Sequence, residues 1–344
     1  GGGTLILSAR NTFRGDATIS NGVLQVAPSG RLYTGYTSAA TLNINGGGKL
    51  QVNTWRWGQD GGIGQLAHES NRIQVDNGTI EYIGSTTDLN NGHGFTINAG
   101  GATLLNNQNV EWNAGSGTSI VNNSSLTFDG SSTGTIRLNA PVTGTGNVVK
   151  NGTVRTVIVA NNTYSGTTTI NAGKLQVGDG GYIGSLSNAT TVTINSGGTL
   201  EYHRGDRQNV EGQIFVGHNI AGSGTLRFKS NNSAVNGAGD YRYTGVNTLS
   251  SSGTYEIDNA RLVVFNQDNL GSSGTTVKIK DGGQLYLGSG GTFSSPLEIE
   301  GMGWKQPNGT QHGALFGYSY TGSTGSGTGG GAITLGGGGT GTNA

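Results

Sequence analysis

The chain has 344 residues, with 67 glycines and 4 prolines, and its 19 basic and 19 acidic side chains give a formal net charge of zero. Glycine without a strict three-residue period excludes collagen, and a charged fraction of only 11% argues against disorder. Charges that are scattered singly argue against a nucleic-acid or anionic-membrane partner. Because there is no cysteine, disulfides and thiolate metal sites are excluded. The sequence has no apolar stretch near the roughly 20 residues that span a bilayer, so we expect no membrane insertion of this fragment.

Short strands are predicted from the N-terminus onward, because apolar residues recur two apart. Leu24 and Val26 form one such pair, Leu42 and Ile44 form another, and the glycines at 46–48 mark a turn. A step of two places both members of a pair on one face of a strand. Helix should be negligible. The residues predicted to point inward include Leu24, Val26, Leu42, Ile44, Leu175, Val177, Val192 and Ile194.

An irregular segment, WRWGQDGGIGQLAHESNR, follows at residues 55–72. Trp55 and Trp57 stand two apart, so they are expected on one strand face. Stacking on a sugar ring is one use for two such indoles. Covering a wide part of the core is an equally good interpretation, and both stay open.

A second copy of the opening phrase begins about 151 residues later. Asn11, Phe13 and Gly15 correspond to Asn162, Tyr164 and Gly166, and the match continues into paired strands. Strands this short cannot fold alone, so each must stack on a copy of itself. Equivalent apolar positions recur after 19 residues, from Leu7 to Val26, and after 26 more, at Val52. The repeat therefore predicts a solenoid of roughly 15 coils, stacked about 4.8 Å apart.

The domain organisation follows from the extent of this pattern. Residues 1–320 are predicted to form one continuous solenoid, and the Gly/Ser/Thr-rich residues 321–344 are predicted to form a linker. A degenerate third copy of the repeat includes Ile257, Leu262 and Val264 and continues to Leu287. The linker-like end and the start in mid-repeat lead us to expect a piece of a longer protein.

Residues 143–181 and 1–26 resemble the passenger-associated repeat of bacterial autotransporters. Gly144, Gly146, Val148 and Lys150 match the lead-in of that repeat, and the Asn-Thr-Tyr-x-Gly turn at residues 162–166 matches its centre. The resemblance implies an all-β fold, a right-handed parallel β-helix of the pertactin type. It also implies a secreted or surface-displayed passenger domain, exported across the outer membrane.

Two Arg-Gly-Asp tripeptides are candidate receptor-binding sites, because a guanidinium and a carboxylate in an exposed loop can engage an integrin-type receptor. In Arg14-Gly15-Asp16 the glycine belongs to the repeat, so chance accounts for the match. Arg204, Gly205 and Asp206 follow a predicted strand and lie in a less regular stretch, where a protruding loop is expected. We therefore nominate this second tripeptide, together with Trp55 and Trp57, as candidate binding residues.

The sequence gives little support for a catalytic site or a metal site. The five histidines are far apart in sequence and form no metal-binding pair, and no serine-nucleophile signature occurs. Glu81, Glu201 and Glu256 occupy outward positions that solenoid stacking could bring together, as in polysaccharide-degrading enzymes. We predict no cofactor, no metal and no catalytic residue.

The favoured function is an adhesin that binds a host-cell or matrix receptor or a glycan, or that associates with itself through the flank or the ends of the solenoid. A polysaccharide-degrading enzyme is the first alternative. It requires at least two carboxylates and a base on neighbouring coils. A structural stalk or fibre subunit is the second alternative, because bare strand edges can pair end to end.

Overall fold

The computed structural model describes residues 2–37, 39–66, 69–89, 92–115, 118–187, 191–205, 214–231, 240–280, 282–288, 295–304, 312–317 and 333–335. The chain divides into two compact units, and the strand ladders described in each are parallel. The first unit is Gly1–Leu175 with Ser185–Ala189, and the second is Gln176–Gly184 with Thr190–Ala344. Parallel pairing between successive coils is the defining feature of a β-solenoid, so the all-β parallel β-helix prediction is confirmed.

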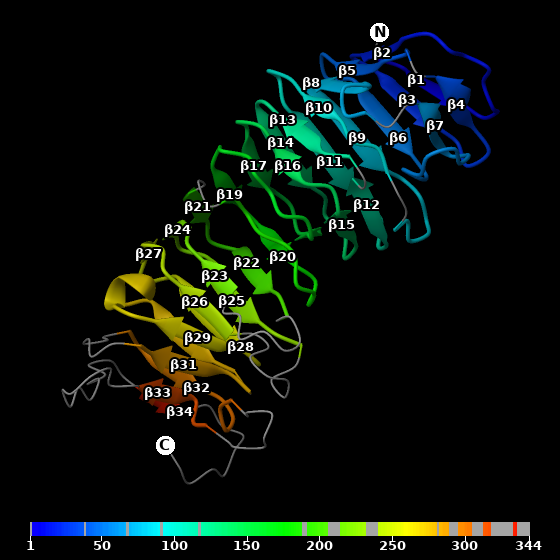
Figure 1. Ribbon diagram of the computed structural model, residues 1–344. Coiled ribbons are helices and arrows are strands. Elements are labelled where there is room, and N and C mark those ends of the chain that lie inside the picture. Colours follow the sequence, from blue (N-terminus) through cyan, green and yellow to red (C-terminus); the bar gives the residue numbers. More distant parts are fainter. Residues whose placement is uncertain are drawn as a thin grey trace. The chain divides into compact units, whose positions relative to one another are not determined.

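Three faces of parallel strands build the first unit (Figure 1). One face runs in the order β1 (Thr4–Leu7), β3 (Val23–Val26), β6 (Lys49–Val52), β9 (Gly78–Tyr82), β11 (Ala102–Asn106), β14 (Ser125–Asp129), β17 (Asn147–Lys150) and β19 (Thr168–Ile170). A second runs through β2 (Ala17–Ser20), β5 (Leu42–Asn45), β8 (Ile73–Asp76), β10 (Thr96–Ile97), β13 (Ile120–Asn122) and β16 (Val142–Thr143). The third holds β12 (Glu111–Gly115), β15 (Thr135–Leu138) and β18 (Arg155–Ile158), while β4 (Arg31–Thr37) pairs with β7 (Gly62–Leu66).

Strand register in the first coils follows the predicted steps. Leu7 pairs with Val26, a step of 19, and Val23 pairs with Lys49, a step of 26. Later coils take more residues where loops are inserted, and Leu42 pairs with Ile73, a step of 31. The predicted roughly 15 coils were therefore too many, and the solenoid has about ten turns.

The core consists of columns of inward side chains, as the two-residue period predicts. Leu24, Leu50 and Ile80 are successive partners in one column, and Val52 and Tyr82 are partners in the next. Every residue predicted to point inward is buried: Leu24, Val26, Leu42, Ile44, Leu175, Val177, Val192 and Ile194. The intervening Gln25, Asn43 and Gln51 are half-buried, because outward side chains of adjacent coils also cover one another.

The asparagine of the repeat joins adjacent coils. The side-chain amide of Asn162, which is 4% exposed, donates to the carbonyls of Ala160 and Ser185 at 2.9 and 2.7 Å. Its Oδ1 accepts a hydrogen bond of 2.8 Å from the Val142 amide. Asn11 in the first copy donates in the same way to Ala9 and Arg31. The residue recurs because it satisfies backbone groups at a corner that the ladders leave unpaired.

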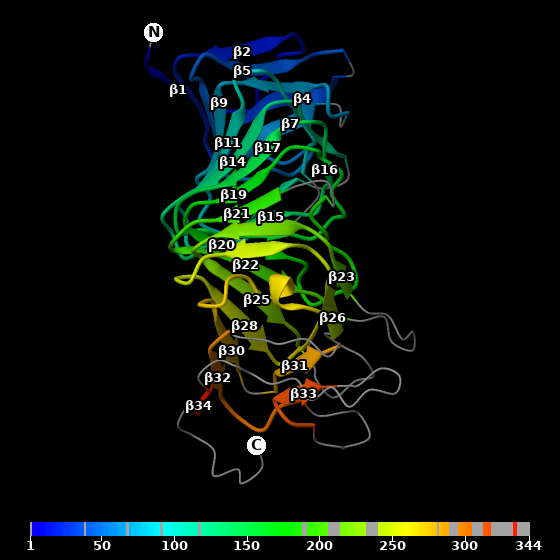
Figure 2. The same cartoon turned by 90° about the vertical axis from the view of Figure 1, so that its left-hand side faces the viewer.

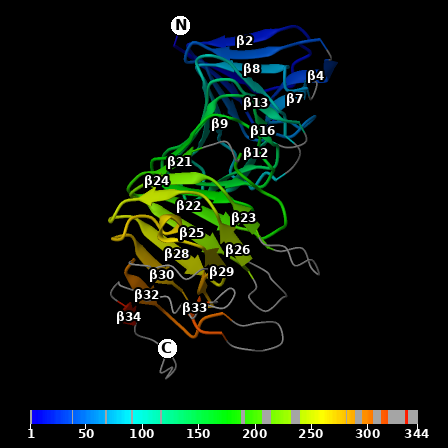
Figure 3. The same ribbon diagram turned by 60° about the vertical axis from the view of Figure 1, so that its left-hand side comes forward.

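The second unit has its own three faces (Figures 2 and 3). β21 (Thr191–Ile194), β24 (Asn219–Gly222) and β27 (Asn247–Leu249) form one face. β22 (Gly198–His203), β25 (Thr225–Lys229), β28 (Thr254–Asp258), β30 (Thr276–Ile279), β32 (Leu297–Ile299) and β34 (Ile333–Leu335) form the second. The third runs through β23 (Ile214–Val216), β26 (Asp240–Tyr243), β29 (Arg261–Val264), β31 (Gln284–Leu287) and β33 (Leu315–Gly317). β20 (Gly173–Val177) lies where the sequence passes from the first unit to the second.

Aromatic rings fill the interior of the second unit. Phe228 stacks between Tyr202 and Tyr255, with centroid distances of 5.6 and 6.2 Å. Tyr241 packs against Phe228 at 5.1 Å and binds the Lys229 carbonyl through its hydroxyl at 2.7 Å. Large rings widen this part of the core, and the hydroxyls of Tyr241 and Tyr255 donate to the carbonyls of Lys229 and Asn269.

The predicted near-absence of helix holds for the described residues, where the helical segment is a 3-10 turn, η1 (Gln267–Asn269). Among those residues no helix has the length and apolar character needed to cross a membrane. Within the predicted linker, the structure describes only residues 333–335, and these form β34 on β32. The rest of residues 321–344 lies outside the described part of the chain, and the single continuous solenoid stays a prediction.

Candidate adhesive surface

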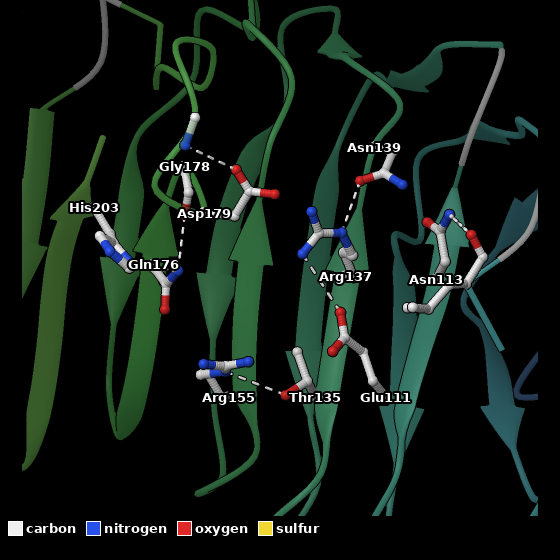
Figure 4. Close-up of polar contacts among 12 residues, drawn as sticks. Glu111, Asn113, Thr135, Arg137, Asn139, Arg155, Gln176, Gly178, Asp179 and His203 are labelled. Atoms are coloured by element: carbon white, nitrogen blue, oxygen red, sulfur yellow. Dashed lines mark hydrogen bonds and ion pairs between the residues drawn. The ribbon is translucent and has the colours of Figure 1, made fainter. Parts of the chain in front are cut away.

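Outward side chains of the first unit form polar contacts from coil to coil. On the face of β12, β15 and β18, Glu111 contacts Arg137 at 3.5 Å, and the Arg137 Nε donates to Asn139 at 3.0 Å (Figure 4). The Arg155 Nε donates to the Thr135 hydroxyl at 3.2 Å on the same face. The strand alternation that buries the core thus creates a polar flank at the same time.

A denser charge ladder covers the corresponding face of the second unit. Successive register partners are Glu201, Arg227, Glu256, Lys278 and Glu298, which alternate in sign. Glu201 is 2% exposed and lies 3.4 Å from the Arg227 guanidinium. Arg227 also pairs with Glu256 at 3.6 Å and with Asp258. At the open end of the ladder, Lys278 and Glu298 pair at 3.1 Å.

A shallow polar groove of about 280 Å³ lies in the first unit. Asp88, 3% exposed, forms its floor and accepts from Arg56 Nε at 2.7 Å and from the Thr54 hydroxyl at 2.6 Å. Asp60, which also lines the groove, accepts three hydrogen bonds from Arg10 and a fourth from Arg31. The hydrogen bond from Arg10 lowers the pKa of Asp60. These charges are paired within the groove.

The two nominated tryptophans differ in environment. Trp55 is fully buried, where its indole lies edge-on to Trp112 at 6.3 Å and its Nε1 donates to the His93 carbonyl at 3.2 Å. Its ring therefore serves the core, and the sugar-stacking interpretation does not apply to it. Trp57 is 36% exposed, and its Nε1 donates to the Leu66 carbonyl. The expected shared face fails because residues 53–56 leave the strand conformation after β6.

The first Arg-Gly-Asp tripeptide lies on the surface. Arg14 and Asp16 are exposed, but one oxygen of Asp16 accepts a hydrogen bond of 2.7 Å from the Thr41 amide of the next coil. This carboxylate thus caps a backbone donor at the start of β5. The contact gives Asp16 a structural role that is independent of any receptor.

The second tripeptide lies only partly within the described residues. Arg204 is half-buried, with its guanidinium donating to the Tyr182 carbonyl at 2.7 Å and its amide to the Tyr241 hydroxyl at 2.8 Å. Burial lowers the pKa of Arg204. The Gly205 amide donates to the Gly181 carbonyl at 3.0 Å, and Asp206 lies outside the described residues. Receptor binding through Arg204, Gly205 and Asp206 stays a prediction.

The carboxylates considered for catalysis belong to both units. Glu81 is in the first unit, where it pairs with Lys49 at 3.0 Å. Glu201 and Glu256 do converge in the second unit, with Arg227 between them. Of the histidines, His68 lies outside the described residues, and His203 hydrogen-bonds Asn231 at 2.6 Å. The described residues contain no group of three or more metal-binding side chains.

A row of register partners on β23, β26, β29, β31 and β33 was not predicted from the sequence. It holds three aromatic rings and one arginine, with the buried Val263 at its centre. Successive register partners there are Phe215, Arg242, Val263, Tyr286 and Phe316. We call these five residues the aromatic–arginine row. The signal was present in the alternation of the strands, but the repeat is worn in this stretch and coil register could not be assigned from it.

The comparisons with known proteins agree with this architecture. The family model of the passenger-associated transport repeat matches residues 1–26 and 148–177. The chain carries passenger-associated transport repeats. The resemblance seen in the sequence is therefore confirmed, and the matched stretches include Asn11 and Lys150.

A protein named "Adhesin BmaC autotransporter", from Brucella suis biovar 1 (strain 1330), is 27% identical to the passenger-repeat chain over 272 residues. The alignment covers 74% of this chain and 7% of that protein, so the chain corresponds to a small part of its relative. No solved structure matches the chain.

Proposed function

We propose that this chain is part of a surface-displayed autotransporter passenger that acts as an adhesin. The relative of Brucella suis, whose name describes an adhesin, is the observation that carries the proposal. The proposal includes export of the chain across the outer membrane, which the same relationship supports. The partner would be a host-cell or matrix receptor, a glycan, or a second copy of the chain.

The separation of side chains into inward columns and outward rows supports this proposal. Inward columns account for stability, so the outward rows of each unit can differ in sequence without loss of the fold. Repeated polar and aromatic groups on the flank offer many weak contacts, and several weak contacts together give useful avidity.

A binding survey tests the proposal. The purified chain, coupled to microspheres, is applied to cultured cells, a matrix-protein array and a glycan array, and self-association is followed by sedimentation. We expect saturable retention on at least one surface, relative to albumin-coated microspheres. Trp57→Ser is the variant that tests the irregular segment, since Trp57 is exposed whereas removal of the buried Trp55 would disturb the core. Absence of retention and of self-association would refute the adhesin proposal.

One observation favours the enzyme alternative, namely the convergence of Glu201 and Glu256 on Arg227. We infer that this cluster is structural, because a guanidinium that pairs with three carboxylates provides neither a free acid nor a free base. Release of reducing sugar or of unsaturated product from polysaccharides, abolished by Glu256→Gln, would establish the alternative instead.

A further inference from the structure

We propose that the charged face of the second unit is a self-association surface, on which a second copy of this chain docks with its coils running in the opposite direction. This inference rests on the proposed adhesive function, since it selects one of the partners and names the surface that binds it. The face is built by β25, β28, β30 and β32, which follow one another in the ladder (Figure 2).

Charges on this face are sorted by coil. Each of the four coils carries two side chains of one sign, two residues apart, while the intervening Phe228, Ile257 and Ile279 are buried. The pairs in coil order are Arg227 and Lys229, Glu256 and Asp258, Lys278 and Lys280, and Glu298 and Glu300. We call these eight residues the striped patch. The stripes read plus, minus, plus, minus, at steps of about 4.8 Å.

Side chains of the striped patch are both held in place and within reach of a partner. Arg227 pairs with Asp258, and Lys280 pairs with Glu300 at 3.5 Å. The exposed fraction of the side chain is 24% at Arg227 and 49% at Glu300. Because the pairs within one molecule fix these side chains, docking orders them at a smaller entropic cost. A carboxylate accepts, and an ammonium donates, more than one hydrogen bond, so the same groups can also pair across an interface.

The order of the stripes selects a second copy in one orientation. When two striped patches face each other with their coils running the same way, every stripe meets its own sign. A twofold axis between β28 and β30 that reverses the direction of the coils places β25 against β32 and β28 against β30. Every stripe then meets the opposite sign, and the contact closes because both copies use the same surface.

Partners of another kind fit the stripes less well. A polyanion would meet a stripe of carboxylates beside each stripe of cations that it contacts, and an apolar partner would desolvate charges without offering them a counter-charge. A patch of alternating sign matches a partner that alternates with the same step, and a second copy of the chain has that step.

The size of the striped patch indicates a weak contact. The outer stripes lie about 14 Å apart, so two facing patches bury less area than a stable dimer needs. Beside the charges runs a row of short uncharged register partners, which allows a second face to approach: Thr199, Thr225, Thr254 and Thr276. Copies displayed together on a surface would add their weak contacts through avidity.

Sedimentation equilibrium of the full chain in low-salt buffer tests the inference. We expect a monomer–dimer equilibrium with a dissociation constant on the order of 100 μM, as befits a small interface. Because the contact depends on charges, raising the salt concentration to about 0.5 M should weaken the association on the order of tenfold.

A charge-swap variant locates the surface. Lys278→Glu and Lys280→Glu, combined with Glu298→Lys and Glu300→Lys, exchange the last two stripes without changing composition or net charge. Both ion pairs of these stripes are kept with their polarity reversed. The stripes then read plus, minus, minus, plus, so in the twofold arrangement every stripe meets its own sign. We expect this variant to associate at least about tenfold more weakly than the parent.

The matched control exchanges an ion pair of the first unit. Lys49→Glu combined with Glu81→Lys should self-associate as the parent does, because this pair lies outside the striped patch. Lys280→Glu with Glu300→Lys alone is a milder swap, at side chains that are 32% and 49% exposed, and should weaken association severalfold. The melting temperature of each variant checks that it folds.

Each other outcome rejects a defined statement. Swap variants that dimerise as tightly as the parent would overturn the striped patch, and growth beyond a dimer would overturn the twofold arrangement. A chain that adheres to cells, matrix or glycans but stays monomeric in low salt would overturn this inference and leave the adhesin proposal intact. A chain that neither adheres nor self-associates would overturn both.

Discussion

At the scale of single residues, Lys150 occupies a position that apolar side chains take in other coils. Its partners in the inward column are Phe128 and Ile170, and its side chain is fully buried. The ammonium group reaches past the column to the turn, where it donates to the carbonyls of Asn151, Gly152 and Ala172. The lysine of the repeat thus ties the turns of two coils together. Desolvation lowers its pKa from 10.5 to about 8.

This pKa predicts a dependence of stability on pH. Between pH 8 and 10.5 the unfolded chain holds a proton on Lys150 that the folded chain has released, so the free energy of unfolding should rise with pH. The full difference is on the order of 3 kcal/mol. We expect the rise in urea titrations between pH 8 and 9.5, below the range in which tyrosines ionise. Lys150→Met should remove that slope, and an equal slope in parent and variant would contradict the assignment.

Val177 tests the inward register at the same scale. Its side chain is fully buried, so Val177→Asp would place a carboxylate in the core without a partner. We expect a loss of roughly 3–5 kcal/mol in the free energy of unfolding, measured with urea. Val246→Asp, at a site that is 53% exposed, is the matched control and should cost less than about 0.5 kcal/mol. An unchanged stability of Val177→Asp would refute the register.

At the scale of the strand, the charge ladder of β22, β25 and β28 depends on one guanidinium. Arg227 pairs with three carboxylates, and one of them, Glu201, is 2% exposed. Removal of a cation beside a buried anion is costly, whereas removal of both partners is often tolerated. The ladder is therefore expected to show strong coupling between Arg227 and Glu201.

A double-mutant cycle measures this coupling. Arg227→Met should destabilise the chain by about 3 kcal/mol, and the double variant with Glu201→Met should recover a large part of that loss. For comparison, Lys278→Met disrupts an ion pair in which both side chains are more than 30% exposed and should cost less than about 1 kcal/mol. Additive losses in the double variant would show that the two residues act separately.

The strands were predictable from the sequence because alternation is a local property. The two-residue step from Leu24 to Val26 is enough to place both side chains on one face of a strand. The 19-residue step from Leu7 to Val26 gives the register between the first two coils. The convergence of Glu201 and Glu256 was not predictable, since it depends on loop lengths between β22 and β28 that no local signal fixes. For Trp55 the sequence left sugar stacking and core packing open, and the buried indole fits core packing. The shared strand face with Trp57 failed because the chain leaves the strand conformation directly after β6. The aromatic–arginine row was not predicted, because the repeat pattern is least regular in this part of the sequence and the register between coils could not be assigned from it.

At the scale of the whole molecule, the coil is the unit of construction. Leu104 pairs with Phe128, and on another face Glu111 pairs with Thr135, so both ladders advance by 24 residues in the same coil. Each coil contacts its neighbours and few other parts of its unit. Removal of one full coil should therefore leave the remaining ladders in register.

A pair of deletions tests this statement. Deletion of residues 104–127 removes 24 residues and should give a folded chain with a β-rich circular dichroism spectrum and a cooperative melt. Deletion of residues 104–115 removes half as many and places strands against turns, so we expect it to unfold or aggregate. Equal behaviour of the two deletions would show that the ladders do not share this period.

The coil-to-coil ladders also govern how the molecule responds to proteases. A cut in an outer turn leaves both new ends paired to the strands of the coils before and after them, through hydrogen bonds such as those that join β9 to β6 and β11. The fragments would stay associated after cleavage. We therefore expect nicked molecules to migrate as one species in native gels and to separate only in denaturant, a resistance obtained without a single disulfide.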